Sequence, residues 1–224
     1  MSIRDWPVEE RPQERLLNEG SEHLSDAELL ALFLRSGQPG QSAVSLARQA
    51  LHHFGNIRNL LCADCADFCR MKGLGVVRYT QLQAALELSR RHLAISLHKA
   101  DALNASHKVK GYLKARLRDL KHEVFAALLL DTQHRILSFE QLSVGTIDQA
   151  TVYPREVARL MLERHAAAVI FAHNHPTGRP EPSDADIRLT HTLKDALALL
   201  DIRVLDHFIV ADQHIVSFAE QGLL

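Results

Sequence analysis

The chain has 224 residues, of which 46% are hydrophobic and 24% are charged. This length suits one large domain or two small ones, and the hydrophobic fraction argues against wholesale disorder. The formal net charge of −1 at pH 7 excludes a protein that is basic over its whole surface, which is the usual signature of nucleic-acid binding. A local basic patch remains compatible with this charge.

No apolar run approaches the ~20 residues of a membrane-spanning helix, so we expect no membrane partner. The first ten residues, MSIRDWPVEE, carry charges where a signal peptide would have its apolar core. We therefore expect a cytoplasmic protein.

The N-terminal part of the chain predicts helices over residues 13–92, because apolar residues recur at helical spacing in 27–34 and 43–51. Ser25, followed three residues later by Glu28, has the pattern of a capping box, so one helix should begin there. The stretch 93–108 lacks such periodicity, and we interpret it as a linker. The sequence thus predicts an all-helical domain over residues 1–99 and a second domain over 102–224.

All three cysteines, Cys62, Cys65 and Cys69, lie within this helical region. Their spacing of i, i+3 and i+7 places them on one face if they share a helix, which favours buried packing. A metal or redox site is the alternative, but a zinc ribbon would need a second C-x-x-C, and the chain has none.

The segment 69–79 resembles a helix-hairpin-helix. In that motif, a turn such as Gly73-Leu74-Gly75 presents backbone N–H groups to a nucleic-acid phosphate without reading bases, and Lys72 and Arg78 could add positive charge. The chain departs from the motif in having a tyrosine where many hairpins carry alanine and a valine where many carry lysine. The alternative is a glycine turn that only joins two packed helices.

The pattern changes class after a predicted helix at 108–120. Strands are expected at 123–131, from 135 onward, at 166–172, 203–210 and 214–218, with helices at 154–165 and 184–200. Strands that alternate with helices in this way predict a mixed α/β sandwich.

The most informative feature is His173-Asn174-His175-Pro176 at the end of a buried strand. Residues two apart on a strand point to the same face, so both histidines can reach one ion while Asn174 faces away. The proline-rich stretch 176–182 can turn the chain so that a new helix brings Asp186 back to them. Two imidazoles and one carboxylate are ligands that zinc accepts, and they leave a fourth position for water.

Two residues near this site also have a purely structural interpretation. Ser183 and Asp186 match a capping box at a helix start, which needs no metal, although Ser183 could serve both purposes. His207, just inside a later strand, could orient a metal ligand, but packing at a strand end is the interpretation favoured by the sequence.

With His173-Asn174-His175-Pro176-Thr177-Gly178, Glu181-Pro182-Ser183 and Asp186, the chain resembles the JAB/MPN (JAMM) metalloprotease family in its bacterial RadC form. Further segments agree with it: 11–15, 24–30, 123–125, 143–146, 154–156, 205–207 and 217–218. Thr177 stands where the family usually has serine. The resemblance implies a three-layer, cytidine-deaminase-like JAB/MPN domain preceded by a small all-α domain.

The resemblance also implies one Zn²⁺ per chain, held by His173, His175 and Asp186. The residues alone offer several carboxylates as general base, among them Glu123, Glu156 and Glu181. The resemblance selects Glu123, and it assigns Ser183 to stabilising the oxyanion.

These residues are most consistent with hydrolysis of a peptide or isopeptide amide bond in an unknown protein or peptide substrate. A zinc deaminase would need H-x-E followed by P-C-x-x-C, which the chain lacks. The family resemblance also implies a rival hypothesis, a factor associated with DNA repair or recombination. Its MPN domain would be a recognition module, and its N-terminal domain would contact DNA without sequence preference.

Overall fold

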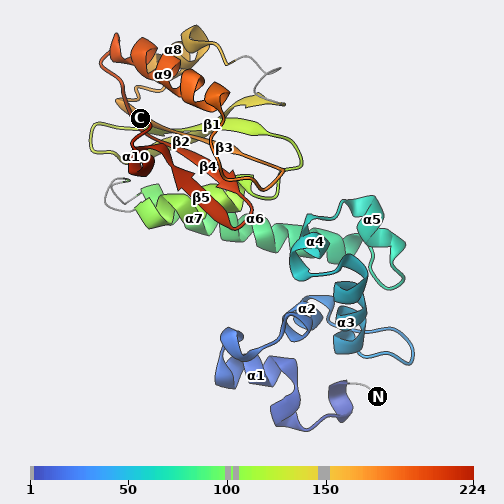
Figure 1. The fold of residues 1–224 in the computed structure, drawn as a ribbon. Coiled ribbons are helices and arrows are strands. Elements are labelled where there is room, and N and C mark those ends of the chain that lie inside the picture. Colours follow the sequence, from blue (N-terminus) through green and yellow to red (C-terminus); the bar gives the residue numbers. More distant parts are fainter. Residues whose placement is uncertain (1–2, 99–101, 103–105, 146–151) are drawn as a thin grey trace. The chain divides into compact units, whose positions relative to one another are not determined.

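The computed structural model describes residues 3–98, 102, 106–145 and 152–224, which divide into two compact units between Leu88 and Ser89 (Figure 1). No helix in these ranges is both long and apolar enough to cross a membrane.

The first unit is helical. Short 3-10 helices at Ile3–Asp5, Val8–Glu10 and Ser21–His23 accompany α1 (Pro12–Glu19), α2 (Asp26–Leu34), α3 (Ala43–Phe54), α4 (Ile57–Cys62), α5 (Cys65–Arg70) and the start of α6 (Val76–His98). The core of the unit joins side chains from α2, α3, α5 and α6, among them Leu30, Leu34, Leu46, Phe68 and Leu82. The predicted start of α2 is confirmed, because Ser25 and Glu28 form both hydrogen bonds of a capping box.

The three cysteines do not share a helix, so the single face that their spacing favoured is not formed. Cys62 ends α4, whereas Cys65 and Cys69 belong to α5. Asp64 begins the new helix by accepting a hydrogen bond from the Asp67 N–H at 2.8 Å, and this cap breaks the predicted face in two. All three thiols are half-buried rather than buried, and Cys65 and Cys69 Sγ lie 4.0 Å apart.

The linker expected at 93–108 is also wrong in its described residues. Helix α6 continues to His98, and α7 (Ser106–Leu117) begins before position 108; residues 99–101 and 103–105 lie outside the described ranges. Tertiary contacts support this end of α6, because Arg90 Nε donates to the Ala115 carbonyl at 3.1 Å and Ala94 packs against the core of the second unit. Packing can hold a helix whose own sequence lacks an amphipathic pattern.

The second unit contains a five-stranded sheet in the order β2-β1-β3-β4-β5. Its strands are β1 (Val124–Leu130), β2 (Ile136–Val144), β3 (Ala168–Asn174), β4 (Arg203–Ala211) and β5 (His214–Ser217). Neighbouring strands are antiparallel except β3 and β4, which run parallel. A parallel pair needs a crossover connection, and α9 (Asp184–Ala198) supplies it.

Helices cover both faces of this sheet (Figure 1). Helix α7 packs on one face against residues such as Leu128 and Ile170, while α8 (Pro154–Glu163) and α9 pack on the other against residues such as Phe125 and Phe171. A short helix, α10 (Phe218–Gln221), follows β5. The predicted mixed α/β class, three-layered and preceded by helices, is therefore confirmed.

The Gly73 turn is packed inside the helical unit. Gly73 has φ +92°, and a Cβ there would overlap the Gln38 amide nitrogen and lie 3.1 Å from Leu46 Cδ1. The same Gln38 nitrogen donates to the Lys72 carbonyl at 2.7 Å. Gly75, by contrast, has no positive φ, and a Cβ at this position would point into open space.

We therefore expect Gly73→Ser to lower the free energy of unfolding by about 1–3 kcal/mol. The serine would have to adopt a left-handed backbone conformation, and its Cβ would clash with Gln38. The matched change Gly75→Ser should alter the free energy of unfolding by no more than about 0.5 kcal/mol. A Cβ at Gly75 would meet no other atom, and serine is a favoured N-cap for the helix α6 that follows. Urea denaturation of the two variants measures both effects. Equal loss in both would contradict this account of the turn.

Candidate metal centre

Strand β3 carries two central residues of the site on opposite faces of the sheet. It pairs with β1 on one side and β4 on the other, and all seven of its residues are buried. His173 pairs with Phe125 in the register and lies on the face covered by α9, whereas the next residue, Asn174, points to the side of α7. The predicted alternation of His173 and Asn174 is confirmed.

The segment after β3 curls so that His175 also faces the site. The His175 N–H donates to the Val210 carbonyl at 3.0 Å, and the Gly178 N–H donates to the His175 carbonyl at 2.9 Å. His175 Nδ1 lies 2.7 Å from the carbonyl oxygen of Arg179. Since a carbonyl can only accept, Nδ1 carries the proton, and Nε2 of the neutral ring presents a lone pair to the site.

Asp186 combines the two interpretations that the sequence offered for it. Its Oδ2 accepts hydrogen bonds from Ser183 N at 2.8 Å and Ser183 Oγ at 2.7 Å, which completes a capping box at the start of α9. Its Oδ1 is buried and has no hydrogen-bond partner among the described residues. A carboxylate oxygen in that position is costly unless a cation compensates it.

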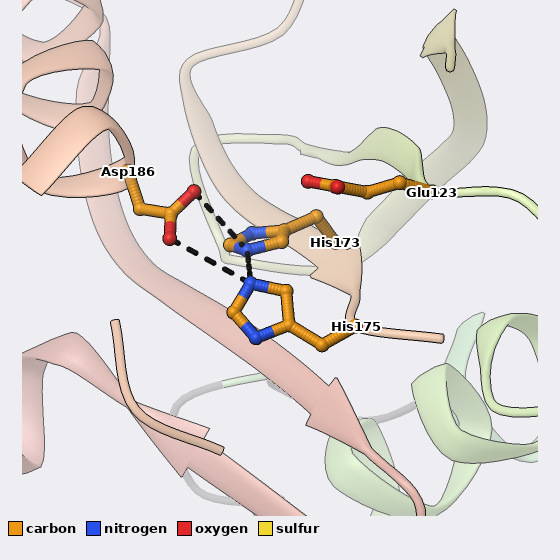
Figure 2. Close-up of side chains that lie close together, drawn as sticks. All are labelled: Glu123, His173, His175 and Asp186. Atoms are coloured by element: carbon orange, nitrogen blue, oxygen red, sulfur yellow. Dashed lines mark hydrogen bonds and ion pairs between the residues drawn. The ribbon is translucent and has the colours of Figure 1, made fainter. Parts of the chain in front are cut away.

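Four predicted residues gather into one cluster: Glu123, His173, His175 and Asp186 (Figure 2). One ligand atom from each lies within 4.8 Å of the others. His173 Nε2 is 2.9 Å from His175 Nε2 and 3.3 Å from Asp186 Oδ1. Of the carboxylates that the sequence offered as base, only Glu123 is part of this cluster; Glu156 instead pairs with Arg159 on α8.

The electrostatics of the cluster keep His173 and Asp186 in the forms that bind metal, whereas they favour the protonated form of His175. Burial lowers the pKa of His173 to about 4, although the charge of Asp186 opposes this shift. Burial alone would raise the pKa of Asp186, but the hydrogen bond with His175, the proximity of His173 and the bonds from Ser183 lower it overall. The pKa of His175 is raised above 6.5, chiefly by its hydrogen bond with Asp186.

The donor set fits a divalent metal ion. Two imidazole nitrogens and one carboxylate oxygen converge, and the uncompensated Asp186 Oδ1 and the closely facing ring nitrogens are the groups that a cation would stabilise. His173, His175 and Asp186 would hold the ion, with Glu123 beside them.

Asn174 positions the segment that carries Glu123, a role that the sequence analysis did not predict. Its Oδ1 accepts from the Val124 N–H at 2.8 Å, and its Nδ2 donates to the carbonyls of His122 at 3.0 Å and Leu120 at 3.3 Å. These bonds bracket Glu123 on both sides in the chain. The only signal in the sequence was an amide side chain, which can both donate and accept, between the two histidines.

The nucleic-acid residues predicted in the helical unit occupy different environments. Lys72 and Gly75 are exposed. Arg78 donates to the carbonyls of Gly73 and Ser36, the latter at 2.6 Å, and so ties the turn to a neighbouring loop. Gly73 itself packs against the side chain of Gln38.

The fold and this cluster together define a JAB-type domain: residues 103–223 match the family model described as a RadC-like JAB domain, and residues 3–80 match the model described as UPF0758 N-terminal. The chain belongs to this family, the UPF0758 proteins with a RadC-like JAB domain. It is 59% identical to a UPF0758 protein of Chromohalobacter salexigens, 58% to one of Azotobacter vinelandii and 56% to one of Cellvibrio japonicus, each over the full length of both chains.

Metal affinity should fall as pH decreases through the raised pKa of His175. Below that pKa the metal-free protein holds a proton on His175 that an ion must displace, so affinity drops by about tenfold per pH unit for one proton. His173 does not compete until about pH 4, and the carboxylate of Asp186 stays ionised. Competition titrations with Zn²⁺ from about pH 5 to 8 measure the slope.

His191→Ala provides the control, because His191 is an exposed histidine on the same helix as Asp186 and its loss should leave the profile unchanged. An affinity that stays constant across this range would show that no protonated histidine competes with the ion.

Proposed function

We propose that this protein is a zinc-dependent hydrolase that binds one Zn²⁺ per chain and cleaves a peptide or isopeptide amide bond. The observation that carries the proposal is the complete cluster of three ligands with a fourth residue, Glu123, beside them. A structural zinc site usually closes with four protein ligands, whereas a catalytic site has three and an open position. The family membership supports the same class of chemistry.

A zinc ion bound by His173, His175 and Asp186 would supply an activated water and a Lewis acid for the substrate carbonyl. The chain's own residues then have three tasks. They hold the ligands in position, they move a proton from the attacking water to the departing amine, and they stabilise the negative charge on the carbonyl oxygen.

Glu123 is suited to the proton transfer. It lies immediately before β1, half-buried, and its carboxylate points toward the histidines (Figure 2). The Asn174 bonds to Val124 and His122 fix the backbone on both sides of it. A carboxylate held in this way can take a proton on one side of the reaction and return it on the other.

Ser183 is our candidate for the oxyanion. Its side chain is exposed, and its hydroxyl is 2.7 Å from Asp186 Oδ2 and 3.1 Å from the Asp186 N–H. To stabilise an oxyanion, the hydroxyl proton must turn from Asp186 toward the substrate. The amide of Asp186 can keep its bond to the Ser183 oxygen throughout, so this rotation does not cost the helix its cap.

Glu123→Gln should keep the metal and lose hydrolysis by roughly 10²-fold or more, because it removes the proton carrier and leaves the three ligands intact. The measurement pairs metal content after dialysis with cleavage of linear and isopeptide-linked fluorogenic peptides. His173→Ala and His175→Ala should instead lose both metal and activity.

Glu156→Gln and Glu181→Gln are the matched controls, since both glutamates are carboxylates outside the cluster. They should retain metal and activity. If Glu123→Gln cleaves as fast as the unchanged protein, Glu123 is not the base. If the unchanged protein binds zinc but cleaves none of these peptides, the rival class, in which the domain recognises a partner without cutting it, is favoured.

A second function, weak contact with nucleic acid, is proposed for the exposed side of the Gly73–Gly75 turn. The observation that favours it is the open space around Gly75, where a phosphate could approach the backbone at the start of α6, with Lys72 exposed nearby in the chain. Arg78 is not included, because its guanidinium is bonded to Gly73 and Ser36.

Fluorescence anisotropy of the full chain with labelled single- and double-stranded DNA should then detect weak, sequence-indifferent binding that falls steeply with salt. Gly75→Phe should block the approach of the backbone, and Lys72→Ala should reduce the salt dependence by about one counterion. Zinc content serves as the control and should not change. If no binding is detected at low salt, the proposed nucleic-acid contact is wrong and the turn only joins packed helices.

A further inference from the structure

His207 is a buried polar residue that lies against three phenylalanine rings. It is fully buried on β4, with the rings of Phe218, Phe125 and Phe171 at centroid distances of 4.5, 5.3 and 6.3 Å. Its ring nitrogens face His173 and the Thr190 hydroxyl, neither of which is anionic, and a charged imidazole would be costly in so buried a place, so the ring is neutral. A neutral imidazole has one nitrogen that donates and one that accepts.

Each nitrogen of His207 has one partner. Nε2 lies 2.8 Å from His173 Nδ1, and Nδ1 lies 2.6 Å from Thr190 Oγ1. Both partners are themselves fully buried, so water does not complete these bonds. The cost of placing an imidazole among phenylalanines is offset only if both contacts are hydrogen bonds.

The direction of these hydrogen bonds follows from the bond that the Thr190 hydroxyl makes to the backbone. Thr190 Oγ1 is 2.6 Å from the backbone carbonyl of Asp186, which can only accept, so the hydroxyl proton is donated there. Thr190 Oγ1 must then accept from His207, which places the His207 proton on Nδ1 and the lone pair on Nε2.

The same reasoning fixes the form of His173. Because His207 Nε2 accepts, His173 Nδ1 must donate, and the proton of His173 therefore lies on Nδ1. The Nε2 of His173, which faces His175 and Asp186, is left with a lone pair. That nitrogen is the one that would bind the ion.

We propose that Thr190 and His207 are positioning residues that hold His173 in the tautomer able to bind metal. This series of hydrogen bonds begins at the backbone carbonyl of Asp186 and ends at His173. The backbone of one predicted ligand therefore determines which ring nitrogen of another carries the proton. This inference rests on the proposed zinc site and adds to it two residues that touch neither the ion nor the substrate.

The sharpest variant is Thr190→Val, which keeps the shape and removes the hydroxyl. His207 Nδ1–H then loses its buried acceptor, so the ring favours the tautomer with its proton on Nε2. That proton is donated to His173 Nδ1 and leaves the His173 proton on Nε2, where it blocks the ion. Thr192→Val is the matched control, because Thr192 makes the same bond to its own helix, to the Arg188 carbonyl at 2.8 Å, but is exposed.

Two measurements decide the proposal. Long-range proton–nitrogen NMR of the metal-free protein, with His173 assigned by its loss in His173→Asn, should show a protonated Nδ1 in the unchanged protein and in Thr192→Val, and a shift toward Nε2 in Thr190→Val. Competition titration should show zinc affinity lowered about 10–100-fold in Thr190→Val and His207→Phe, and unchanged in Thr192→Val. His207→Gln, whose amide oxygen can accept from His173 Nδ1, should recover most of the affinity that His207→Phe loses.

A proton on Nε2 of His173 in the unchanged metal-free protein overturns the proposal, as does full zinc affinity in Thr190→Val. Failure of the proposed function is a separate outcome: if the unchanged protein binds no zinc, the hydrolase proposal fails, while the NMR result still decides whether Thr190 and His207 set the tautomer. Should His207→Phe fail to fold, Thr190→Val and its control carry the test alone.

Discussion

The site depends on the register of the central strand β3. This strand is buried on both faces, between β1 and β4, and its side chains alternate. At its end, the alternation sends His173 toward α9 and Asn174 toward the segment before β1. One residue therefore reaches the ion site while its neighbour fixes the backbone around Glu123. A shift of the β3 register by one residue would exchange the faces of His173 and Asn174, so both the ion site and the bonds around Glu123 would be lost.

Helix α9 couples the stability of the domain to its chemistry. Asp186 uses one carboxylate oxygen to cap the helix, and the other, buried and without a hydrogen-bond partner among the described residues, faces the histidines. An ion at this place would stabilise the folded state, because it binds only when the strand and helix are assembled. The helix cap and the candidate metal site therefore use different oxygens of the same side chain and do not exclude each other.

In the helical unit, Gly73 and Arg78 contribute to the packing of the turn. Gly73 is required by a left-handed backbone against Gln38, and Arg78 ties that turn to Ser36. What remains accessible for a ligand is the side of the turn at Gly75 and Lys72. The residues of a motif that resembles a nucleic-acid hairpin can thus be divided into those that build the turn and those that are exposed to solvent.

The sequence by itself determined the elements and the candidate ligands, because these depend on short-range rules: strand alternation placed His173 opposite Asn174, and capping patterns located the starts of α2 and α9. It misjudged the end of α6 and the cysteine face, where tertiary packing and the Asp64 cap override local periodicity. Only the tertiary structure could select Glu123 over Glu156 by position, or connect Thr190 through His207 to His173. Those contacts join residues far apart in the chain, and their distances and hydrogen-bond directions exist only once the sheet and α9 are packed together.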